Sequence, residues 1–461
     1  MKEKLLIKRF VIKKLFGVYD VDIPFKSNIN IFIGENGLGK TTILNTLNYV
    51  LQGDSESLLS INFEKIIVVL GDNSKIEIIH SDLKSSVNVY KEKYIRYVSW
   101  NDEYDFLSRR IALELLKEEK KTDLESDQLK DKILKRIKTK SDISFSSLED
   151  VYDSVIKDEK FREQFSDSWE LKIYNYIKKF GNLIYLPTYR RIEEDFNSYI
   201  ENSFDDKYYR KDRKRKNFSY LQFGMDDVQE LINKSCNTLK SNTNEGFKGM
   251  TSNLLTSYID INEEKQILKN DYNKIDMNNL EIVFSRLADK IDSNVKQKIF
   301  DMISNEKYID DKYHKYLFSI INELINIYEK NKQIDDNLEN FKDVCNRYLV
   351  NKSIIYDKIK IECEVEQNNT SIPISLRDLS SGEKQIISLF SKLYLNSDDS
   401  NIILFDEPEL SLSILWQKKL IPDILNSQRC NFIAVITHSP FIFDNEYVES
   451  AIDLKKFIIE I

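Results

Sequence analysis

Glycine is scarce in this chain: 11 of the 461 residues are glycine, whereas an average protein contains about 7%. Proline occurs six times and histidine three times. So few histidines leave little room for catalytic schemes that combine several imidazoles. Because glycine is so rare, the glycines at positions 34, 37 and 39 mark a segment whose backbone needs conformations that other residues avoid.

The chain also lacks a cysteine framework and long apolar runs. Its four cysteines show no CxxC spacing, a pattern that predicts reduced thiols and argues against a zinc site. No apolar run approaches the roughly 18 residues of a membrane span, and the first residues do not resemble an export leader. We therefore expect a cytoplasmic protein that makes no membrane contact.

Positive charge is not in excess. Lysine and arginine total 68 against 76 aspartates and glutamates, which gives a formal charge of −8. The overall charge does not favour nucleic-acid binding, so any such surface must be a local patch. The candidate patch is the basic run KYYRKDRKRK at residues 207–216. It has two interpretations, a solvated loop or a contact with nucleic acid or a protein partner, and both stay open.

The order of predicted strands and helices indicates an α/β protein with about two or three domain-sized units. Residues 1–100 combine strands with one helix, residues 101–346 are mainly helical, and residues 347–461 alternate strand and helix. Such alternation is typical of a parallel sheet. We therefore predict a head built from 1–100 and 347–461, interrupted by a mainly helical insertion. One further head strand is expected inside the insertion, near 182–195.

A phosphate-binding loop is predicted at GENGLGKT, residues 34–41, which matches the pattern GxxxxGK followed by Ser or Thr. The glycines let backbone N–H groups turn around phosphate oxygens, and the N-terminus of the following helix adds partial positive charge. Lys40 would reach the β- and γ-phosphates, and the Thr41 hydroxyl would ligate Mg²⁺. The residues expected to contact ATP here are Gly34, Asn36, Gly37, Gly39, Lys40, Thr41 and Thr42.

Two apolar segments near the C-terminus carry the other catalytic candidates. IILFDEPEL, residues 402–410, places Asp406 to hold Mg²⁺ and Glu407 to act as general base toward water. NFIAVITHSP, residues 431–440, places His438 at a strand end, where a γ-phosphate sensor would lie. Each pattern alone also has a structural interpretation, because acids often follow apolar strands and most single histidines are not ligands.

The segment LSSGEKQ, residues 379–385, precedes an amphipathic helical pattern. Ser380 or Ser381 could simply cap that helix. Capping accounts for one serine, but it does not explain the whole sequence Ser-Ser-Gly-Glu at a helix start.

The order of these segments resembles that of ABC-type ATPases: Walker A (GENGLGKT), signature (LSSGEKQ), Walker B (FDEPEL) and H-loop (THS). The signature is similar to that of the RecF, SMC and Rad50 branch. The resemblance implies a P-loop NTPase head with a mixed sheet and helices on both faces. It also implies Mg²⁺-dependent ATP hydrolysis, with Lys40, Glu407 and His438 as catalytic residues.

The same resemblance implies a homodimer or higher homo-oligomer. In ABC-type ATPases the signature of one subunit faces the ATP that is bound by another subunit, so each site is shared. The signature residues implied to contact ATP are Ser380, Ser381, Gly382 and Glu383.

Two segments in the middle of the chain indicate which group of ABC-type ATPases the sequence resembles. YLPTYRRIEED (185–195) and FGMDDVQELI (223–232) resemble stretches in ATPases of bacterial anti-phage systems, the Septu ATPases called PtuA and the PARIS ATPases called AriA. The resemblance implies that the protein senses infection and controls a separate nuclease or other effector protein. The first segment departs from the ABC pattern, because it offers Pro187, Thr188, Arg190 and Arg191 where a Q-loop glutamine is expected.

Other functions are compatible with the same motifs. A RecF-like or SMC-like DNA repair ATPase would share them, and so would a nucleotide-gated scaffold that binds ATP with little turnover. A transporter subunit is disfavoured, because its coupling surface needs no long helical insertion. The intact Lys40, Asp406, Glu407 and His438 argue against a chain without activity.

Overall fold

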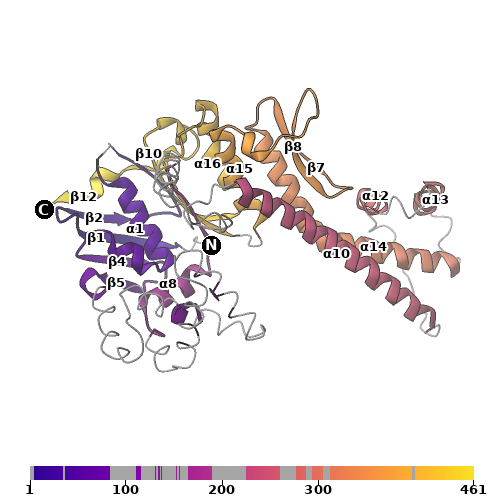
Figure 1. Ribbon diagram of the computed structural model, residues 1–461, viewed down its shortest axis with the longest axis horizontal. Coiled ribbons are helices and arrows are strands. Elements are labelled where there is room, and N and C mark those ends of the chain that lie inside the picture. The colour runs from indigo at the N-terminus through magenta and orange to yellow at the C-terminus, as the bar shows by residue number, and fades with distance from the viewer. Residues whose placement is uncertain are drawn as a thin grey trace, which may run out of the picture. The chain divides into compact units, whose positions relative to one another are not determined.

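The computed structural model describes residues 5–34, 37–83, 165–188, 225–259, 277–286, 293–304, 312–396 and 400–461, with scattered helical positions between 111 and 155. Figure 1 shows these segments coloured along the chain. They belong to two compact units, Met1–Gln222 with Asp398–Ile461, and Phe223–Ser397. The first unit therefore contains both ends of the chain.

The first unit contains an antiparallel sheet with the strand order β12-β2-β1-β4-β5. Along β4, buried side chains alternate with partly exposed ones, so one face of the strand packs into the core. The strands are β1 (Ile7–Leu15), β2 (Tyr19–Pro24), β4 (Lys65–Leu70), β5 (Lys75–Ile79) and β12 (Ile458–Glu460).

A second sheet of the same unit is parallel throughout, with the strand order β11-β3-β10-β9-β6. All residues of β9 are buried, as expected for a strand that is covered on both faces. Strand β6 lies within the range near 182–195 where the sequence predicts a further head strand. The strands are β3 (Ile29–Ile33), β6 (Asn182–Leu186), β9 (Asn401–Asp406), β10 (Cys430–Thr437) and β11 (Ala451–Asp453).

Parallel pairing brings the carboxyl ends of β3, β9 and β10 to one edge of this sheet. Thr437, the last residue of β10, pairs with Ile33 of β3, and the residue before it pairs with Asp406 of β9. The phosphate loop, the two Walker B acids and the THS segment follow these strand ends. An edge of this kind is where ligands bind in open α/β sheets.

Helix α1 follows the phosphate loop and packs with residues of both sheets in one hydrophobic cluster. It begins after Gly39 and ends before Gly53, and both glycines adopt the left-handed conformation, with φ angles of 71° and 67°. The helices of this unit are α1 (Lys40–Gln52), α2 (Ser55–Leu59), α8 (Trp169–Ile177) and α16 (Ile414–Asn426). Its 3₁₀ helices are η3 (Pro440–Ile442), η4 (Val448–Ser450) and η5 (Leu454–Phe457).

The second unit is dominated by two long helices, α10 and α14, which lie side by side (Figure 1). Apolar residues of α12 and α14 share a hydrophobic cluster, and β7 pairs with β8 in an antiparallel hairpin. The mainly helical character predicted for the insertion is confirmed where the structure describes it. The elements are α10 (Met225–Ile259), α12 (Met277–Arg286), α13 (Ser293–Ser304), α14 (Lys312–Asn346), β7 (Lys352–Asp357), β8 (Glu362–Gln367), η2 (Leu376–Asp378) and α15 (Ser381–Leu395).

A buried ion pair joins α12 to α14. Arg286 Nη2 lies 2.7 Å from both carboxylate oxygens of Asp335, and the two side chains are 4% and 0% exposed. Arg286 Nε donates to the carbonyl oxygen of Lys358 at 2.9 Å, and the Tyr356 hydroxyl donates to Asp335. Buried charges are costly unless they are paired and hydrogen-bonded, and this cluster meets both conditions for Arg286 and Asp335.

The α/β class and the helical insertion that the sequence predicts are confirmed by this architecture. The domain limits 1–100, 101–346 and 347–461 stay predictions. The basic run 207–216 and the arginines within 189–195 lie outside the described residues. Among the described helices, none has the length and apolar composition that crossing a membrane requires.

Candidate nucleotide-binding site

The phosphate loop lies between β3 and α1, and its glycines adopt conformations that side chains disfavour. Gly37 and Gly39 have φ angles of 90° and 71°. A Cβ atom at Gly39 would in addition meet Phe16 Cε2 at 3.1 Å. The scarce glycines therefore stand where the backbone requires them. The predicted contact Asn36 lies outside the described residues.

Lys40, the first residue of α1, turns back over this loop. Its Nζ donates to the carbonyl oxygen of Gly34 at 2.8 Å and lies 2.6 Å from Nε2 of His438. An ammonium group only donates, so the imidazole Nε2 is the acceptor in this contact. Burial lowers the pKa of Lys40, although three nearby carboxylates oppose the shift. The structure thus brings together Lys40 and His438, two predicted site residues that lie 398 positions apart in the sequence.

Thr41 and Thr42 follow Lys40 on the first turn of α1, and both are half-buried. The carbonyl oxygen of Thr42 accepts a hydrogen bond from Thr46 Oγ1 at 2.6 Å within the helix. Thr41 stands next to the loop at the helix N-terminus, which is the position of the Mg²⁺ ligand in P-loop proteins.

Asp406 and Glu407 stand at the carboxyl end of β9. Asp406 is buried, and its Oδ2 accepts a hydrogen bond from Thr188 Oγ1 at 2.8 Å. Glu407 has a φ angle of 47°, and its backbone N–H donates to the carbonyl oxygen of Ile436 at 2.8 Å. Its Oε1 lies 3.6 Å from Nε2 of His438. A strained backbone at a glutamate is typical of functional sites.

The surroundings of Glu407 make its carboxylate more basic than an exposed one. Burial raises the pKa of Glu407, and the charges of Asp406 and Glu409 raise it further, while His438 and Lys40 oppose the shift. A carboxylate with a raised pKa accepts a proton more readily than an exposed one. The electrostatics therefore suit the predicted role as a general base.

Sequence reasoning missed a third acid of this cluster, Glu409. Its Oε1 accepts hydrogen bonds from the backbone N–H groups of His438 at 2.6 Å and Ser439 at 3.2 Å. Its Oε2 accepts a hydrogen bond from Thr437 Oγ1 at 2.7 Å. The motif FDEPEL contains this glutamate, but no local pattern indicates a contact with residues that follow a different strand.

Phe16 is a second residue that the motifs did not indicate. It lies in the turn between β1 and β2, with a φ angle of 56° and a side chain that is 45% exposed. The ring edge approaches Gly39 of the phosphate loop. Large aromatic side chains are mostly buried, so an exposed ring beside this loop is a candidate for ligand contact. The sequence offered one signal for this residue, because Phe16 precedes Gly17 and a glycine often marks a turn.

The signature residues lie in the second unit, at the N-terminus of α15. Ser380 Oγ accepts a hydrogen bond from the backbone N–H of Glu383 at 3.4 Å, and Glu383 Oε2 accepts one from the backbone N–H of Ser380 at 2.8 Å. This capping box confirms that Ser380 caps the helix. Lys352 Nζ lies 2.9 Å from the Glu383 carboxylate. Ser381 and Gly382 are the first two residues of the helix.

A family model of the AAA ATPase domain matches residues 7–443, which include every site residue described above. The chain belongs to the AAA ATPase domain family. AAA ATPase domains typically bind ATP with Mg²⁺ and hydrolyse it. Comparison of this AAA ATPase domain with curated proteins gave no match.

The solved structures that are similar to this AAA ATPase domain include three Smc heads. An Smc head domain with an extended coiled coil, bound to the C-terminal domain of ScpA and derived from Pyrococcus furiosus, is 12% identical, with a TM-score of 0.32 over 99% of this chain and 96% of that one. An SmcHead bound to the C-winged helix domain of ScpA is 11% identical, with a TM-score of 0.32 over 95% of this chain and 90% of that one. An Smc head domain with a coiled coil and joint from Pyrococcus yayanosii is 16% identical, with a TM-score of 0.30 over 95% and 93%.

Proposed function

We propose that this AAA ATPase domain binds ATP with Mg²⁺ at the edge of its parallel sheet and hydrolyses it. The observation that carries the proposal is the meeting of Lys40, Glu407 and His438, which come from three separate segments of the sequence. The backbone N–H groups of the loop and the N-terminus of α1 would surround the phosphates. The Lys40 ammonium, which donates to His438 in the structure, would donate to phosphate oxygens instead.

The residues expected to hold Mg²⁺ suit that ion. Mg²⁺ prefers oxygen ligands and is usually bound by one or two protein groups together with water and phosphates. The Thr41 hydroxyl on the first turn of α1 and the Asp406 carboxylate at the end of β9 supply such oxygens. When bound, the ion neutralises negative charge on the transferred phosphoryl group.

Glu407 and His438 would act on the reacting groups. Glu407, whose pKa is raised by burial and by neighbouring carboxylates, would accept a proton from the attacking water. His438 would contact an oxygen of the γ-phosphate and stabilise the charge that develops there. Their separation of 3.6 Å is compatible with two groups acting on one phosphoryl group and its water.

Phe16 would bind the nucleobase. Its exposed ring approaches the loop that would hold the phosphates, and aromatic rings stack on every base because each base has a π-face. A base platform at this position would add affinity for ATP without taking part in the reaction.

We also propose that the active form is a homodimer or higher homo-oligomer with shared sites. Ser381 and Gly382 begin α15, and the backbone N–H groups of a helix N-terminus favour phosphate. Ser380 is engaged in capping, so Ser381 and Gly382 are the better candidates for contact with ATP from a neighbouring subunit.

The finer proposal is a role in anti-phage defence, in which the ATPase senses infection and controls a separate nuclease or effector protein. It rests on the resemblance of residues 185–195 and 223–232 to ATPases of the Septu and PARIS systems. DNA repair and a low-turnover scaffold are the competing functions, and the experiments below distinguish them.

The first experiment measures ATP hydrolysis by the wild-type protein and by two lysine variants. Lys40→Ala should abolish hydrolysis, because the variant lacks the group that holds the β- and γ-phosphates. Lys419→Ala is the matched control, since Lys419 is an exposed residue of α16 in the same unit, and it should leave the rate unchanged. Unchanged hydrolysis by Lys40→Ala would show that the loop is only a structural turn.

The second experiment measures plaque formation on bacteria that carry this gene together with its genomic neighbours. Protection against phage that is lost with Lys40→Ala would support defence. Absence of protection, together with ATP hydrolysis that duplex DNA stimulates, would favour the repair function. ATP binding without measurable turnover would favour the scaffold.

A further inference from the structure

The THS segment at the end of β10 is held by a carboxylate that the proposed reaction does not use. We propose that Glu409 is a positioning residue, which fixes the backbone of His438 and so directs its imidazole toward the γ-phosphate. The inference rests on the proposed ATP hydrolysis, and it assigns to Glu409 no contact with ATP, Mg²⁺ or water.

The Glu409 carboxylate binds three consecutive residues. Its Oε1 lies 2.6 Å from the backbone nitrogen of His438 and 3.2 Å from that of Ser439. Its Oε2 accepts the hydrogen bond of the Thr437 hydroxyl at 2.7 Å. Hydrogen bonds to an ionised carboxylate are shorter and stronger than neutral ones. The carboxylate therefore defines the path of the backbone at the point where the chain leaves β10.

Gln417 of α16 reinforces the same arrangement. Its Oε1 accepts a hydrogen bond from Ser439 Oγ at 2.6 Å, and its Nε2 donates to the carbonyl oxygen of Leu412 at 2.9 Å. Gln417 is buried, its bond to Leu412 is buried with it, and its bond to Ser439 is partly buried. The turn after β9, the turn after β10 and helix α16 are thereby linked through two side chains, Glu409 and Gln417.

The imidazole of His438 is restrained from two sides in the structure. Glu409 holds its backbone, and the Lys40 ammonium lies 2.6 Å from its Nε2. In the proposed reaction Lys40 turns to the phosphates of ATP, and the ring loses that hydrogen bond. The bond from Glu409 to the backbone would then remain, so Glu409 keeps the imidazole in place during catalysis. If Glu409 only stabilised the fold, its removal would disturb His438 no more than it disturbs the rest of the first unit.

The kinetic test is a double-mutant cycle with Glu409→Ala, His438→Ala and the combined variant. Glu409→Ala should lower kcat for ATP hydrolysis about 10- to 100-fold, the cost of a misplaced reacting group, with little change in KM. In the His438→Ala background the same substitution should have no further effect on kcat. Glu409→Gln should retain most activity, because its amide oxygen still accepts the two backbone hydrogen bonds. Glu449→Ala is the matched control, an exposed glutamate of the same unit.

An activity-independent test uses the histidine content of the chain. The sequence contains three histidines, so ¹⁵N-histidine labelling gives a simple NMR spectrum in which His438→Ala identifies the His438 signals. Without ATP, Glu409→Ala should shift or broaden these signals and leave those of His80 and His314 unchanged, and Glu409→Gln should leave all three close to wild type. If Glu409→Ala does not fold, Thr437→Val removes one donor and should shift the same signals less.

Two results would overturn the inference. One is an unchanged His438 signal in Glu409→Ala. The other is a further loss of kcat when Glu409→Ala is combined with His438→Ala. Failure of the proposed function is a different result, because a wild-type protein that does not hydrolyse ATP still yields the His438 spectrum.

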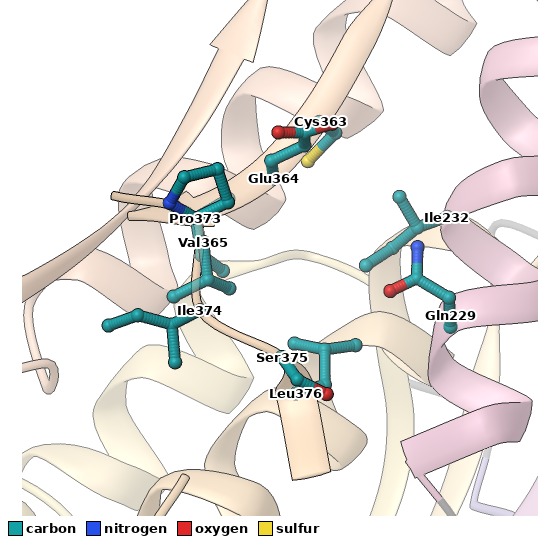
Figure 2. Close-up of a pocket in the computed structure, with 10 residues that line it drawn as sticks. Gln229, Ile232, Cys363, Glu364, Val365, Pro373, Ile374, Ser375 and Leu376 are labelled. Atoms are coloured by element: carbon teal, nitrogen blue, oxygen red, sulfur yellow. The ribbon is translucent and has the colours of Figure 1, made fainter. Parts of the chain in front are cut away.

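The second unit contains a pocket that is lined by residues of α10, of β8 and of the segment that leads into η2. Figure 2 shows Gln229 and Ile232 of α10 facing Cys363 and Val365 of β8 across it, with Leu376 at its base. Burial raises the pKa of the Cys363 thiol to about 12, so this cysteine is a poor nucleophile. The Cys363 thiol therefore gives this pocket no reactive group.

Discussion

At the level of single residues, the site uses backbone conformations that side chains normally avoid. Phe16 and Glu407 have φ angles of 56° and 47°, and such conformations cost about 1–3 kcal/mol each. Each is held by a backbone hydrogen bond of 2.8 Å, from Phe16 to Asn62 and from Glu407 to Ile436. The fold therefore supports strain at one residue beside the loop and at one of the two Walker B acids, which is consistent with a functional role for both.

Glu407→Gln should still bind ATP and Mg²⁺ but should slow hydrolysis at least 100-fold, because only the acceptance of a proton from water is lost. Since burial raises the pKa of Glu407, the wild-type rate should fall on acidification at a higher pH than an exposed glutamate would cause. The variant should lack this dependence. Steady-state hydrolysis and nucleotide binding measured across pH would check both points, and hydrolysis at the wild-type rate would exclude Glu407 as the base.

Phe16→Ala should weaken ATP binding about tenfold, since a lost aromatic contact is worth roughly 1–1.5 kcal/mol. Binding of inorganic triphosphate, which has no base, should be unchanged. Val18→Ala is the matched control, because Val18 is an exposed apolar residue of the same turn region. Calorimetry with both ligands would make the comparison. An equal loss of affinity for ATP and triphosphate would mean that Phe16 supports the loop rather than the base.

At the level of elements, two sets of side-chain contacts stabilise the second unit. The capping box of Ser380 and Glu383 defines where α15 begins, and the buried pair of Arg286 and Asp335 joins α12 to α14. The first satisfies backbone groups at a helix end, whereas the second pairs charges that would otherwise be costly to bury. Their contributions to stability and to activity can be measured separately.

Ser380→Ala should lower the free energy of unfolding by about 1 kcal/mol, the usual value for an N-cap serine. Ser381→Arg leaves the cap intact, so it should unfold at nearly the wild-type temperature and yet lose ATP hydrolysis by blocking the signature. Thermal unfolding and hydrolysis would be measured on both variants. Full activity of Ser381→Arg would show that LSSGE is only a helix start.

Arg286→Met should destabilise the second unit by about 3–5 kcal/mol, because it leaves the Asp335 charge buried without a partner. Arg377→Met is a matched control within the same unit. Arg377 pairs with Asp226 at 2.6 Å, but both side chains are more than 70% exposed, so this loss should stay below about 1 kcal/mol. Hydrogen exchange in α12 and α14 would locate the effect, and equal destabilisation by both variants would contradict the argument.

At the level of the whole molecule, shared sites predict that mixed dimers of two inactive variants recover ATP hydrolysis. An ATPase whose sites each lie within one subunit would not show this recovery. Lys40→Ala and Ser381→Arg homodimers should each be inactive, because every site contains one damaged half. Equal co-expression makes about half of the dimers mixed, and each mixed dimer has one intact site of two. Activity should therefore recover to roughly a quarter of wild type if the sites act independently. A purified mixed dimer without activity would mean that the sites are strictly coupled or not shared.

Local sequence patterns were sufficient for much of the fold and of the candidate site. The glycine spacing of the loop predicts the left-handed backbone of Gly37 and Gly39, because that geometry depends on adjacent residues. Alternating strand and helix patterns predict the parallel sheet, and a parallel sheet places strand ends at one edge. The sequence therefore predicts Lys40, Glu407 and His438 as site residues, and the structure brings these three side chains together.

Other features were decided only by the tertiary structure. The contacts of Glu409 with His438, of Thr188 with Asp406, and of Phe16 with Gly39 join residues that are distant in the sequence. They depend on strand order and register, which result from packing of the whole unit. A periodic pattern shows which face of a strand is buried, but it does not show which strand becomes its neighbour. The motifs therefore predict the reacting groups, whereas the groups that hold them in place follow from the assembled sheet.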